Sequence, residues 1–268
     1  QKFLVSATMT RDPQKLARLG LVHPLDLNVS QMKASSTGSS SYTMPNSLVE
    51  RTVECTAQQK PLVLLALLAE LLFERDETRV VIFTSNLDST HRLARLLQLV
   101  WPYMMLENKG TVREFSSALS QQERSSLVAD CRRGEVAVVV CSDGMSRGMD
   151  LPRVQAVVNY DVPTTAKTYV HRSGRTARAG AKGLVITLLK GVGQRGTFTR
   201  MRQLVDSPQR VQGNYELQKE LIRSIPYKRC IGLLREVLEV EKNGELSMSA
   251  PLPARFTEEA GMLPATRN

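Results

Sequence analysis

The chain has 268 residues, which allows one large domain or two smaller ones and a core that buries roughly three quarters of the unfolded chain's surface. Its 36 Lys and Arg against 26 Asp and Glu give a formal charge of +10, which favours a polyanionic partner, either nucleic acid or an acidic membrane surface. The longest apolar run, residues 61–69, ends at Glu70 and is too short to cross a bilayer, so the composition excludes a membrane-spanning protein.

Four cysteines are spread along the chain without a C-x-x-C pair and without a histidine nearby at metal-ligand spacing. This arrangement is typical of buried, reduced cysteines in an intracellular protein. We therefore predict no bound metal and no disulfide-linked partner. The four residues are Cys55, Cys131, Cys141 and Cys230.

The first segment, residues 1–29, has the pattern of a domain end. It opens in apolar strand residues without Met or a charged leader and continues through Ser6, Ala7 and Thr8 to a short helical pattern. We interpret the chain as a fragment of a longer protein. A Ser-rich stretch that cannot pack a core follows, so we place a flexible linker at residues 30–47.

After the linker, apolar runs rich in β-branched residues alternate with helical periods. Near-continuous runs such as 136–140 are typical of a parallel sheet with helices on both faces, because a sheet covered on one face would show alternation. We therefore predict an α/β doubly wound domain over 48–205 that binds ligands at the carboxyl ends of its strands. Strands are expected at 49–56, 80–84, 136–141, 154–160 and 184–189, and helices at 61–73, 89–100, 121–133 and 196–205.

The remaining residues, 206–268, are predicted to form a helical extension with a tail. Helical periods at 214–222 and 227–241 precede a Pro-containing segment from Ser249, which we expect to be poorly packed. The two helices either pack on the α/β domain or receive a partner protein, and we favour packing on the domain.

A cluster of positive charge follows the strand expected at 154–160. His171, Arg175 and Arg178 are spaced at 0, +4 and +7, which predicts that they share one face of a helix. Residues 164–188 contain no Asp or Glu, although a solvated basic face usually carries interleaved carboxylates. This deficit favours a bound polyphosphate or nucleic-acid backbone, which arginine recognises through its planar fork of donors.

These residues carry a resemblance to a known family. The string His171-Arg172-x-Gly174-Arg175-x-x-Arg178 resembles motif VI of the DEAD-box ATP-dependent RNA helicases. Other segments resemble further motifs, in the family's order. They are Ser6-Ala7-Thr8 for motif III, Val81-Ile82-Phe83-Thr84 for motif IV, Gln121-x-x-Arg124 for motif IVa, and Ser142-Asp143 through Arg147-Gly148-x-Asp150 for motif V.

The resemblance covers about residues 1–205 and implies a RecA-like fold. No G-x-x-x-x-G-K-[ST] phosphate loop and no Asp-Glu-Ala-Asp box occurs in the chain, and both belong to the family's first RecA-like domain. We therefore expect residues 1–29 to end that first domain and residues 48–205 to form the second. The chain alone is then expected neither to hydrolyse ATP nor to unwind RNA, since half of each site lies in the first domain.

In this family, ATP and single-stranded RNA are held between the two RecA-like domains. By resemblance, Arg178 is the catalytic arginine finger, Arg175 is its neighbour on the γ-phosphate, and His171 couples to the first domain, as does the Ser-Ala-Thr segment. Asp150, beside the flexible Gly148, resembles the carboxylate that accepts from the ATP ribose hydroxyl. The ligands of Mg²⁺ are expected in the first domain.

On the RNA side, the resemblance places Arg124 and the hydroxyl of Ser142 against backbone phosphates, so that binding is indifferent to base sequence. Gln121 and Asp143 of the same motifs are also expected to bind RNA. Ser142 stands where the family usually has Thr. The hydroxyl is retained, so we expect little loss of function from this difference.

The segment Thr84-Ser85-Asn86 has two interpretations of equal weight. Its hydroxyl and amide groups either contact RNA or cap the helix expected from Ser89. Phe83 continues an apolar strand and is expected in the core. His23 and His91 have no recognisable partner in the sequence and are expected on the surface or on a helix face.

Some segments, most distinctively Glu114-Phe115-Ser116-Ser117, are most similar to the DEAD-box protein 51 group, whose members are implicated in large ribosomal subunit assembly. The resemblance therefore implies a protein of the nucleus and nucleolus, with pre-ribosomal RNA and ribosome assembly factors as partners. The leading hypothesis is the second half of an ATP-dependent RNA helicase. The alternative is a non-unwinding RNA clamp or scaffold, since both activities need the same motifs. A Rossmann-type enzyme is disfavoured because the Gly-rich segment 174–183 precedes a strand.

Overall fold

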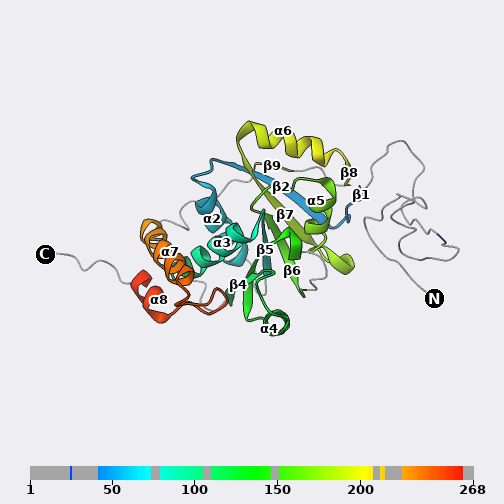
Figure 1. Cartoon of the computed structure of the whole chain (residues 1–268). Helices are drawn as coiled ribbons and strands as arrows, with labels where there is room; N and C mark the ends of the chain where they lie inside the picture. The colour runs from blue at the N-terminus through cyan, green and yellow to red at the C-terminus, as the bar shows by residue number, and fades with distance from the viewer. Residues whose placement is uncertain are drawn as a thin grey trace.

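The structure is a computed structural model that describes residues 25, 42–73, 79–104, 110–145, 151–207, 212–214 and 225–261 (Figure 1). Several residues that the sequence singles out lie outside these ranges. They are Ser6, Ala7, Thr8, His23, Arg147, Gly148 and Asp150, together with residues 215–222 of an expected helix.

Seven parallel strands form one sheet in the order β4-β5-β3-β6-β7-β2-β9. They are β2 (Leu48–Cys55), β3 (Arg79–Thr84), β4 (Thr111–Phe115), β5 (Val136–Ser142), β6 (Val154–Asn159), β7 (Gly183–Lys190) and β9 (Gln212–Asn214). β3 and β5 are buried along their whole length, which explains their continuous β-branched runs. The predicted doubly wound sheet is confirmed, and β4, which the sequence analysis missed, extends it at one edge.

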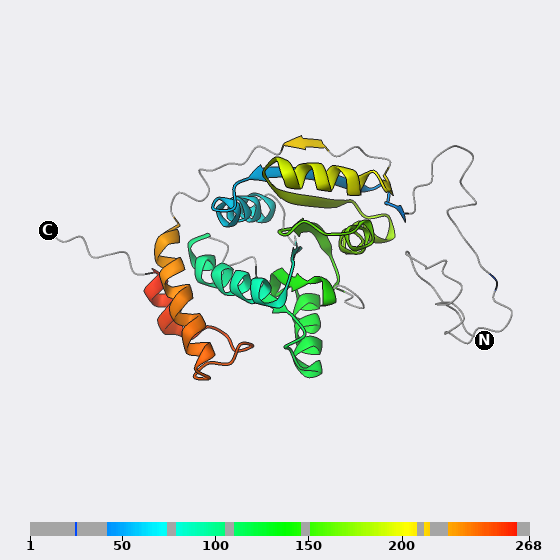
Figure 2. The same ribbon diagram turned by 45° about the horizontal axis from the view of Figure 1, so that its top comes forward.

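Helices cover both faces of this sheet. α2 (Lys60–Phe73) and α3 (Leu87–Val100) share a hydrophobic core with one face. α4 (Gln121–Arg133), α5 (Ala166–Ser173) and α6 (Gly191–Arg202) share a second core with the other face. Figure 2 shows α7 (Tyr227–Lys242) and α8 (Ala254–Gly261), in orange and red, packed beyond α3. Across the helices that the structure describes, none combines the length and apolarity that a membrane crossing needs.

A short parallel pairing joins β1 (Tyr42–Thr43) to β8 (Val205–Asp206). Met44 follows β1 and is buried in the second core. The described end of the segment expected as a linker therefore packs on the α/β domain. The division of the chain at 1–29, 30–47, 48–205 and 206–268 stays a prediction.

The bounds of α4 agree with the predicted helix, and local chemistry explains why. The Ser120 side chain accepts a hydrogen bond from the backbone of Glu123, whose carboxylate accepts one from the Ser120 backbone in return. At the other end Gly134 adopts a left-handed conformation with φ of 84° and closes the helix. Both signals are local, so the sequence alone specifies where this helix begins and ends.

α6 begins at Gly191, five residues before the predicted start at Gly196. Glycines at 191, 193 and 196 have low helix propensity, which favoured a loop in the sequence analysis. Packing of Phe198 and Met201 into the second core overrides that local preference.

The segment from Ser249 is packed, so the predicted loose tail is wrong for its described part. Arg95 on α3 donates hydrogen bonds to the carbonyls of Ser247, Met248 and Ala250. Phe256 on α8 is 4% exposed and joins the first core. No local sequence pattern reports an arginine that lies some 150 positions earlier in the chain.

His91 lies on α3, as the helix-face expectation allows, but it is buried and has two partners that the sequence did not reveal. Its Nδ1 lies 2.7 Å from a carboxylate oxygen of Glu114, and its Nε2 lies 2.7 Å from one of Glu241. Arg95 donates to the other oxygen of Glu241 at 2.8 Å. These four residues, here called the His91 cluster, join α3, β4 and α7.

Two opposing effects act on the pKa of His91. Burial lowers it, but the hydrogen bonds and charges of Glu114 and Glu241 together raise it more, so the pKa lies above its ordinary value. The protonated ring thus stabilises the docking of α7 on α3.

The His91 cluster predicts a pH-dependent stability. Its contribution is complete below the ordinary histidine pKa of about 6.5 and is lost as the pH rises through the raised pKa. Replacing His91 with Gln should lower the free energy of unfolding by about 2 kcal/mol at about pH 6 and flatten its pH dependence. Urea unfolding of the chain between about pH 5.5 and about pH 8.5 measures both effects.

The matched control is Arg92→Gln, because Arg92 is the next residue of α3 and its side chain is 60% exposed. This variant should keep the pH dependence of the parent chain. A His91→Gln variant with the same pH dependence as the parent would contradict the interpretation.

Candidate nucleotide and RNA interface

The centre of the candidate site is a buried arginine near the end of α5. Arg172 is 1% exposed, and its Nε and Nη2 donate to the two carboxylate oxygens of Asp143 at 2.5 and 2.8 Å. Its Nη1 donates to Asn159 Oδ1 at 3.1 Å and to the carbonyl of Asp161 at 2.6 Å. The guanidinium also lies 5.2 Å from the centre of the Phe83 ring. Every nitrogen of this side chain is therefore bonded inside the domain.

This geometry corrects one sequence argument. The absence of carboxylates from residues 164–188 favoured a phosphate ligand for the whole basic cluster. For Arg172 the compensating carboxylate is Asp143, which comes from the loop after β5. The two residues are 29 positions apart in the sequence, so the sequence did not reveal the pair. Because its guanidinium is buried and paired with Asp143, Arg172 is a structural residue rather than a phosphate ligand.

The partners of Arg172 lie on both sides of β3, where the order of the strands reverses. β5 and β6 both pair with β3 and lead away from it to opposite sides of the sheet. Asp143 follows β5 and Asp161 follows β6, so the guanidinium bridges the loops at this switch point. Crevices at such points are the usual ligand sites of open α/β sheets.

Asp161 is a central residue that the sequence analysis missed. Its carboxylate accepts from the Lys60 ammonium at 2.5 Å and from the Ser85 backbone N–H at 2.9 Å. Burial raises its pKa, but the hydrogen bond and charge of Lys60 outweigh burial, and the pKa lies below its ordinary value. The available signal was an Asp directly after a buried strand, at the edge where α/β sheets bind ligands.

Four of the residues expected to contact RNA end or follow three neighbouring strands, β4, β5 and β3, on the carboxyl side of the sheet. Ser142 ends β5, and its Cα pairs in register with that of Thr84 in β3, so Ser85 follows next to it. Gln121 and Arg124 lie in the first turns of α4, shortly after β4. Ser85 and Gln121 are exposed, Arg124 is partly exposed, and Ser142 is 7% exposed.

Arg124 is already oriented by the fold. Its Nη2 donates to the carbonyl of Ser117 at 3.1 Å. Its Nε is buried and has no hydrogen-bond partner among the described residues. The side chain is therefore held against the loop after β4, at the edge where RNA contacts are expected.

Thr84 was also expected to contact RNA, but its side chain is directed into the domain. Its side chain is fully buried, and its hydroxyl lies 2.6 Å from that of Thr90 and 3.3 Å from the carbonyl of Cys141. The capping interpretation holds for Asn86, whose side chain accepts from the backbone N–H of Ser89 at 2.8 Å. Phe83 is fully buried, which confirms its core position.

Asp143 was also expected to bind RNA. Its carboxylate instead holds Arg172 in a two-bond pair. An acidic side chain repels phosphate, so we assign Asp143 to the support of Arg172.

The three motif VI side chains do not share one helix face, which corrects the spacing argument. α5 ends at Ser173 with Gly174 as its cap, so Arg175 and Arg178 lie beyond the helix. Arg175 Nε donates to the carbonyl of His171 at 3.2 Å, and Arg178 Nε donates to that of Gly174 at 2.9 Å. Each guanidinium therefore folds back toward the end of α5.

Residues 174–181, here called the arginine turn, lie at the amino ends of β6 and β7. Thr176 donates to the carbonyl of Val154, the first residue of β6, at 2.8 Å. Within the turn Arg178 is exposed and Arg175 is partly exposed. The turn therefore lies at the opposite end of the strands from the ligand site expected at their carboxyl ends. The candidate site has two parts joined by α5. One is the arginine turn, and the other, here called the carboxyl edge, comprises Ser85, Gln121, Arg124 and Ser142.

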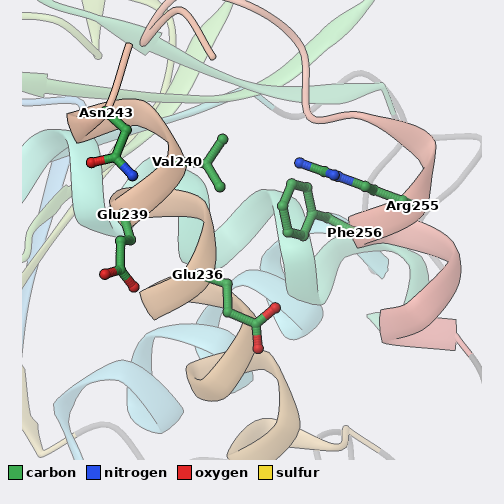
Figure 3. Close-up of a pocket in the computed structure, with 6 residues that line it drawn as sticks. All are labelled: Glu236, Glu239, Val240, Asn243, Arg255 and Phe256. Carbon is green, nitrogen blue, oxygen red and sulfur yellow. The ribbon is translucent and has the colours of Figure 1, made fainter. Parts of the chain in front are cut away.

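Other features of the described residues lie outside this site. All four cysteines are buried free thiols, as predicted, and burial raises the pKa of each one. No group of three or more His, Cys, Asp or Glu suited to a metal occurs within the described ranges. A cavity of about 390 Å³ lies between α7 and α8 (Figure 3), lined by Glu236, Glu239, Val240, Asn243, Arg255 and Phe256. It belongs to the helical extension and contains none of the motif residues.

Comparisons with known proteins agree with the resemblance. Residues 63–180 match the helicase conserved C-terminal domain. The chain is 39% identical over 193 residues to "Probable ATP-dependent RNA helicase ddx51" of Dictyostelium discoideum, covering 70% of the chain and 33% of that protein. It is 34% identical over 250 residues to "ATP-dependent RNA helicase DDX51" of Homo sapiens, covering 90% of the chain and 35% of that protein. The chain thus spans about a third of the length of these relatives.

Solved structures show the same fold. S. cerevisiae Dbp5 bound to RNA and ADP BeF3 matches with a TM-score of 0.55 at 22% identity, over 87% of this chain and 54% of that one. E. coli DEAD-box protein SrmB bound to regulator of ribonuclease activity A (RraA) matches with a TM-score of 0.52 at 27% identity, over 65% of this chain and 93% of that one.

The sheet order, the helices on both faces and these matches define a RecA-like helicase C-terminal domain. These similarities support a C-terminal domain of the DEAD-box RNA helicase type, and the chain is similar to the DDX51 proteins.

The pairing of Arg172 with Asp143 makes a prediction about stability. Arg172→Lys keeps the charge but loses the two-bond fork and the donors to Asn159 and Asp161. It should lower the free energy of unfolding by about 2 kcal/mol, measured by urea unfolding. Lys167→Gln is the matched control, because Lys167 is an exposed basic residue of the same helix and should change stability little. Equal stability of the two variants would contradict the role of Arg172.

Proposed function

We propose that this chain supplies the second RecA-like half of an ATP-dependent RNA helicase and that its arginine turn reaches the triphosphate of ATP. The observation that carries the proposal is the difference in exposure among the motif VI arginines. Arg172 is buried and hydrogen-bonded inside the domain, whereas Arg178 is exposed and Arg175 is partly exposed just beyond the end of α5. Guanidinium groups placed in this way suit phosphate oxygens in position and charge.

In this proposal Arg178 acts as the arginine finger and Arg175 as its neighbour on the γ-phosphate. Both stabilise the charge that develops as the terminal phosphoryl group is transferred to water. His171 lies in the last turn of α5 and would couple this helix to the first domain. Asp150 and Gly148 would hold the ribose, and the Ser6-Ala7-Thr8 segment would link the domains. The first domain would supply the ligands of Mg²⁺.

The carboxyl edge is the proposed RNA surface. Ser85, Gln121, Arg124 and Ser142 offer hydroxyl, amide and guanidinium donors across three adjacent strand ends. Such donors recognise phosphate and sugar groups, which carry no base information. RNA and nucleotide would thus meet the same domain at different ends of α5, and Arg172 would tie the two regions together.

The RNA target is proposed to be pre-ribosomal RNA in a large-subunit precursor within the nucleolus, with ribosome assembly factors as partners. The support is similarity to proteins named DDX51, and to "ATP-dependent RNA helicase dbp6" of Aspergillus niger at 41% identity over 198 residues. A non-unwinding RNA clamp would use the same contacts. Displacement of a short duplex strand, compared with ATP-dependent retention of RNA, separates the two activities.

The arginine finger predicts a specific loss of catalysis. In the full-length protein, Arg178→Ala should lower RNA-stimulated ATP hydrolysis by about 10³-fold to 10⁵-fold, because transition-state charge is no longer stabilised. RNA affinity should be largely retained. Lys182→Ala, an exposed basic residue close in sequence, serves as the control and should keep turnover. Near-normal turnover of Arg178→Ala would refute the assignment, as would ATP hydrolysis by the isolated chain.

The carboxyl edge predicts a salt-dependent RNA contact. Arg124→Gln should weaken binding to single-stranded RNA and reduce the slope of log affinity against log salt by about 0.7 to 1. Fluorescence anisotropy over a series of KCl concentrations measures this slope. Arg132→Gln, an exposed basic residue at the other end of α4, should leave it nearly unchanged. Equal slopes for the two variants would remove Arg124 from the interface.

A further inference from the structure

The arginine turn has a strained backbone on both sides of Arg178. Ala177 has φ of 54° and ψ of 34°, and Ala179 has φ of 51° and ψ of 36°. Both lie in the left-handed region, which disfavours residues with a Cβ atom. Two such residues around one exposed arginine persist only where the surrounding structure enforces the conformation.

Thr176 helps to hold the strained backbone of the arginine turn in place. It is 1% exposed, and its hydroxyl oxygen lies 2.8 and 3.0 Å from the carbonyl oxygens of Val154 and Gln155. These carbonyls begin β6, a strand inside the sheet. The residue two positions before Arg178 is therefore bonded directly to the rigid part of the domain.

Gly183, the first residue of β7, also helps to hold the strained backbone of the arginine turn. A Cβ atom placed on it would lie 2.5 Å from the backbone nitrogen of Ala177, 2.5 Å from Thr176 Oγ1 and 2.8 Å from the Ala177 Cβ. No real Cβ atom tolerates these distances, so a side chain here would displace the turn. Ala177 is 7% exposed because it packs in this space. Glycine at this position is thus required by close approach of the turn, since its own φ is not in the left-handed region.

We propose that Thr176 and Gly183 are positioning residues that fix the orientation of Arg178 toward the phosphate of ATP. They act through Ala177. The hydrogen bonds of the Thr176 hydroxyl and the close approach that Gly183 permits together hold Ala177 in its strained conformation. This inference rests on the proposed function of Arg178. Small displacements of a catalytic group reduce turnover strongly, and a shift of about 1 Å costs on the order of 100-fold.

The test uses the full-length protein and compares kcat, the KM for ATP, RNA affinity and the melting temperature. Thr176→Val keeps the shape but removes the hydroxyl anchor, and Gly183→Ala pushes the turn away from β7. Each should lower kcat by about tenfold or more while RNA affinity and the KM for ATP change by less than about threefold. Thr176→Ser retains the hydroxyl and should recover most of the turnover.

Gly193→Ala is the matched glycine control, because a Cβ atom there meets nothing within 4 Å. It should keep both turnover and RNA affinity. Adding Thr176→Val to Arg178→Ala should cause no further loss of kcat, because both changes act on one group. A further loss equal to that in the parent protein would overturn the proposal.

The remaining outcomes separate this inference from the proposed function. If Arg178→Ala abolishes turnover but Thr176→Val and Gly183→Ala hydrolyse ATP normally, the positioning role is wrong and the arginine finger stands. If Arg178→Ala hydrolyses ATP normally, the proposed function fails first. If Gly183→Ala does not fold, the comparison of Thr176→Val with Thr176→Ser decides. A loss of RNA affinity and melting temperature in parallel with kcat for Thr176→Val would indicate a general structural role and overturn the proposal.

Discussion

The buried guanidinium of Arg172 organises the functional edge of this domain. Two strand ends contribute its acceptors, on the two sides of β3: Asp143 follows β5, whereas Asn159 ends β6 and Asp161 follows it. A fully desolvated arginine is costly unless every donor is satisfied, so the arrangement tolerates little rearrangement. Asp143 and Asp161 are thereby held in place, and the end of α5 is fixed relative to the sheet. The positions of Arg175 and Arg178 follow from this constraint.

The two parts of the candidate site are built in different ways. The carboxyl edge presents short polar side chains at the ends of adjacent parallel strands, where strand register sets their spacing. The arginine turn presents long charged side chains from a strained backbone that packs against the start of β7. Strain and close packing suit a charged group that must meet a developing charge with little reorganisation. Shallow polar contacts suit a ligand recognised through its repeating backbone.

The helical extension is part of the folded domain rather than an appendage. The His91 cluster places the Glu241 carboxylate of α7 between His91 and Arg95 of α3, and Phe256 closes the apolar part of the contact. Buried charges of this kind favour one docking geometry, because any shift leaves a charge without its partner. The sequence showed an amphipathic helix there, and packing on the domain is what the structure shows for α7.

The sequence by itself determined the order and type of most elements, because its signals are local. Continuous β-branched runs identified β3 and β5, and Ser120, Glu123 and Gly134 fixed the limits of α4. The motif residues also identified the family, since their spacing is read along the chain. Only the tertiary structure decided what those residues do. Whether Arg172 meets a phosphate or Asp143, and whether His91 meets solvent or two carboxylates, depends on segments far apart in sequence that folding brings within hydrogen-bond distance.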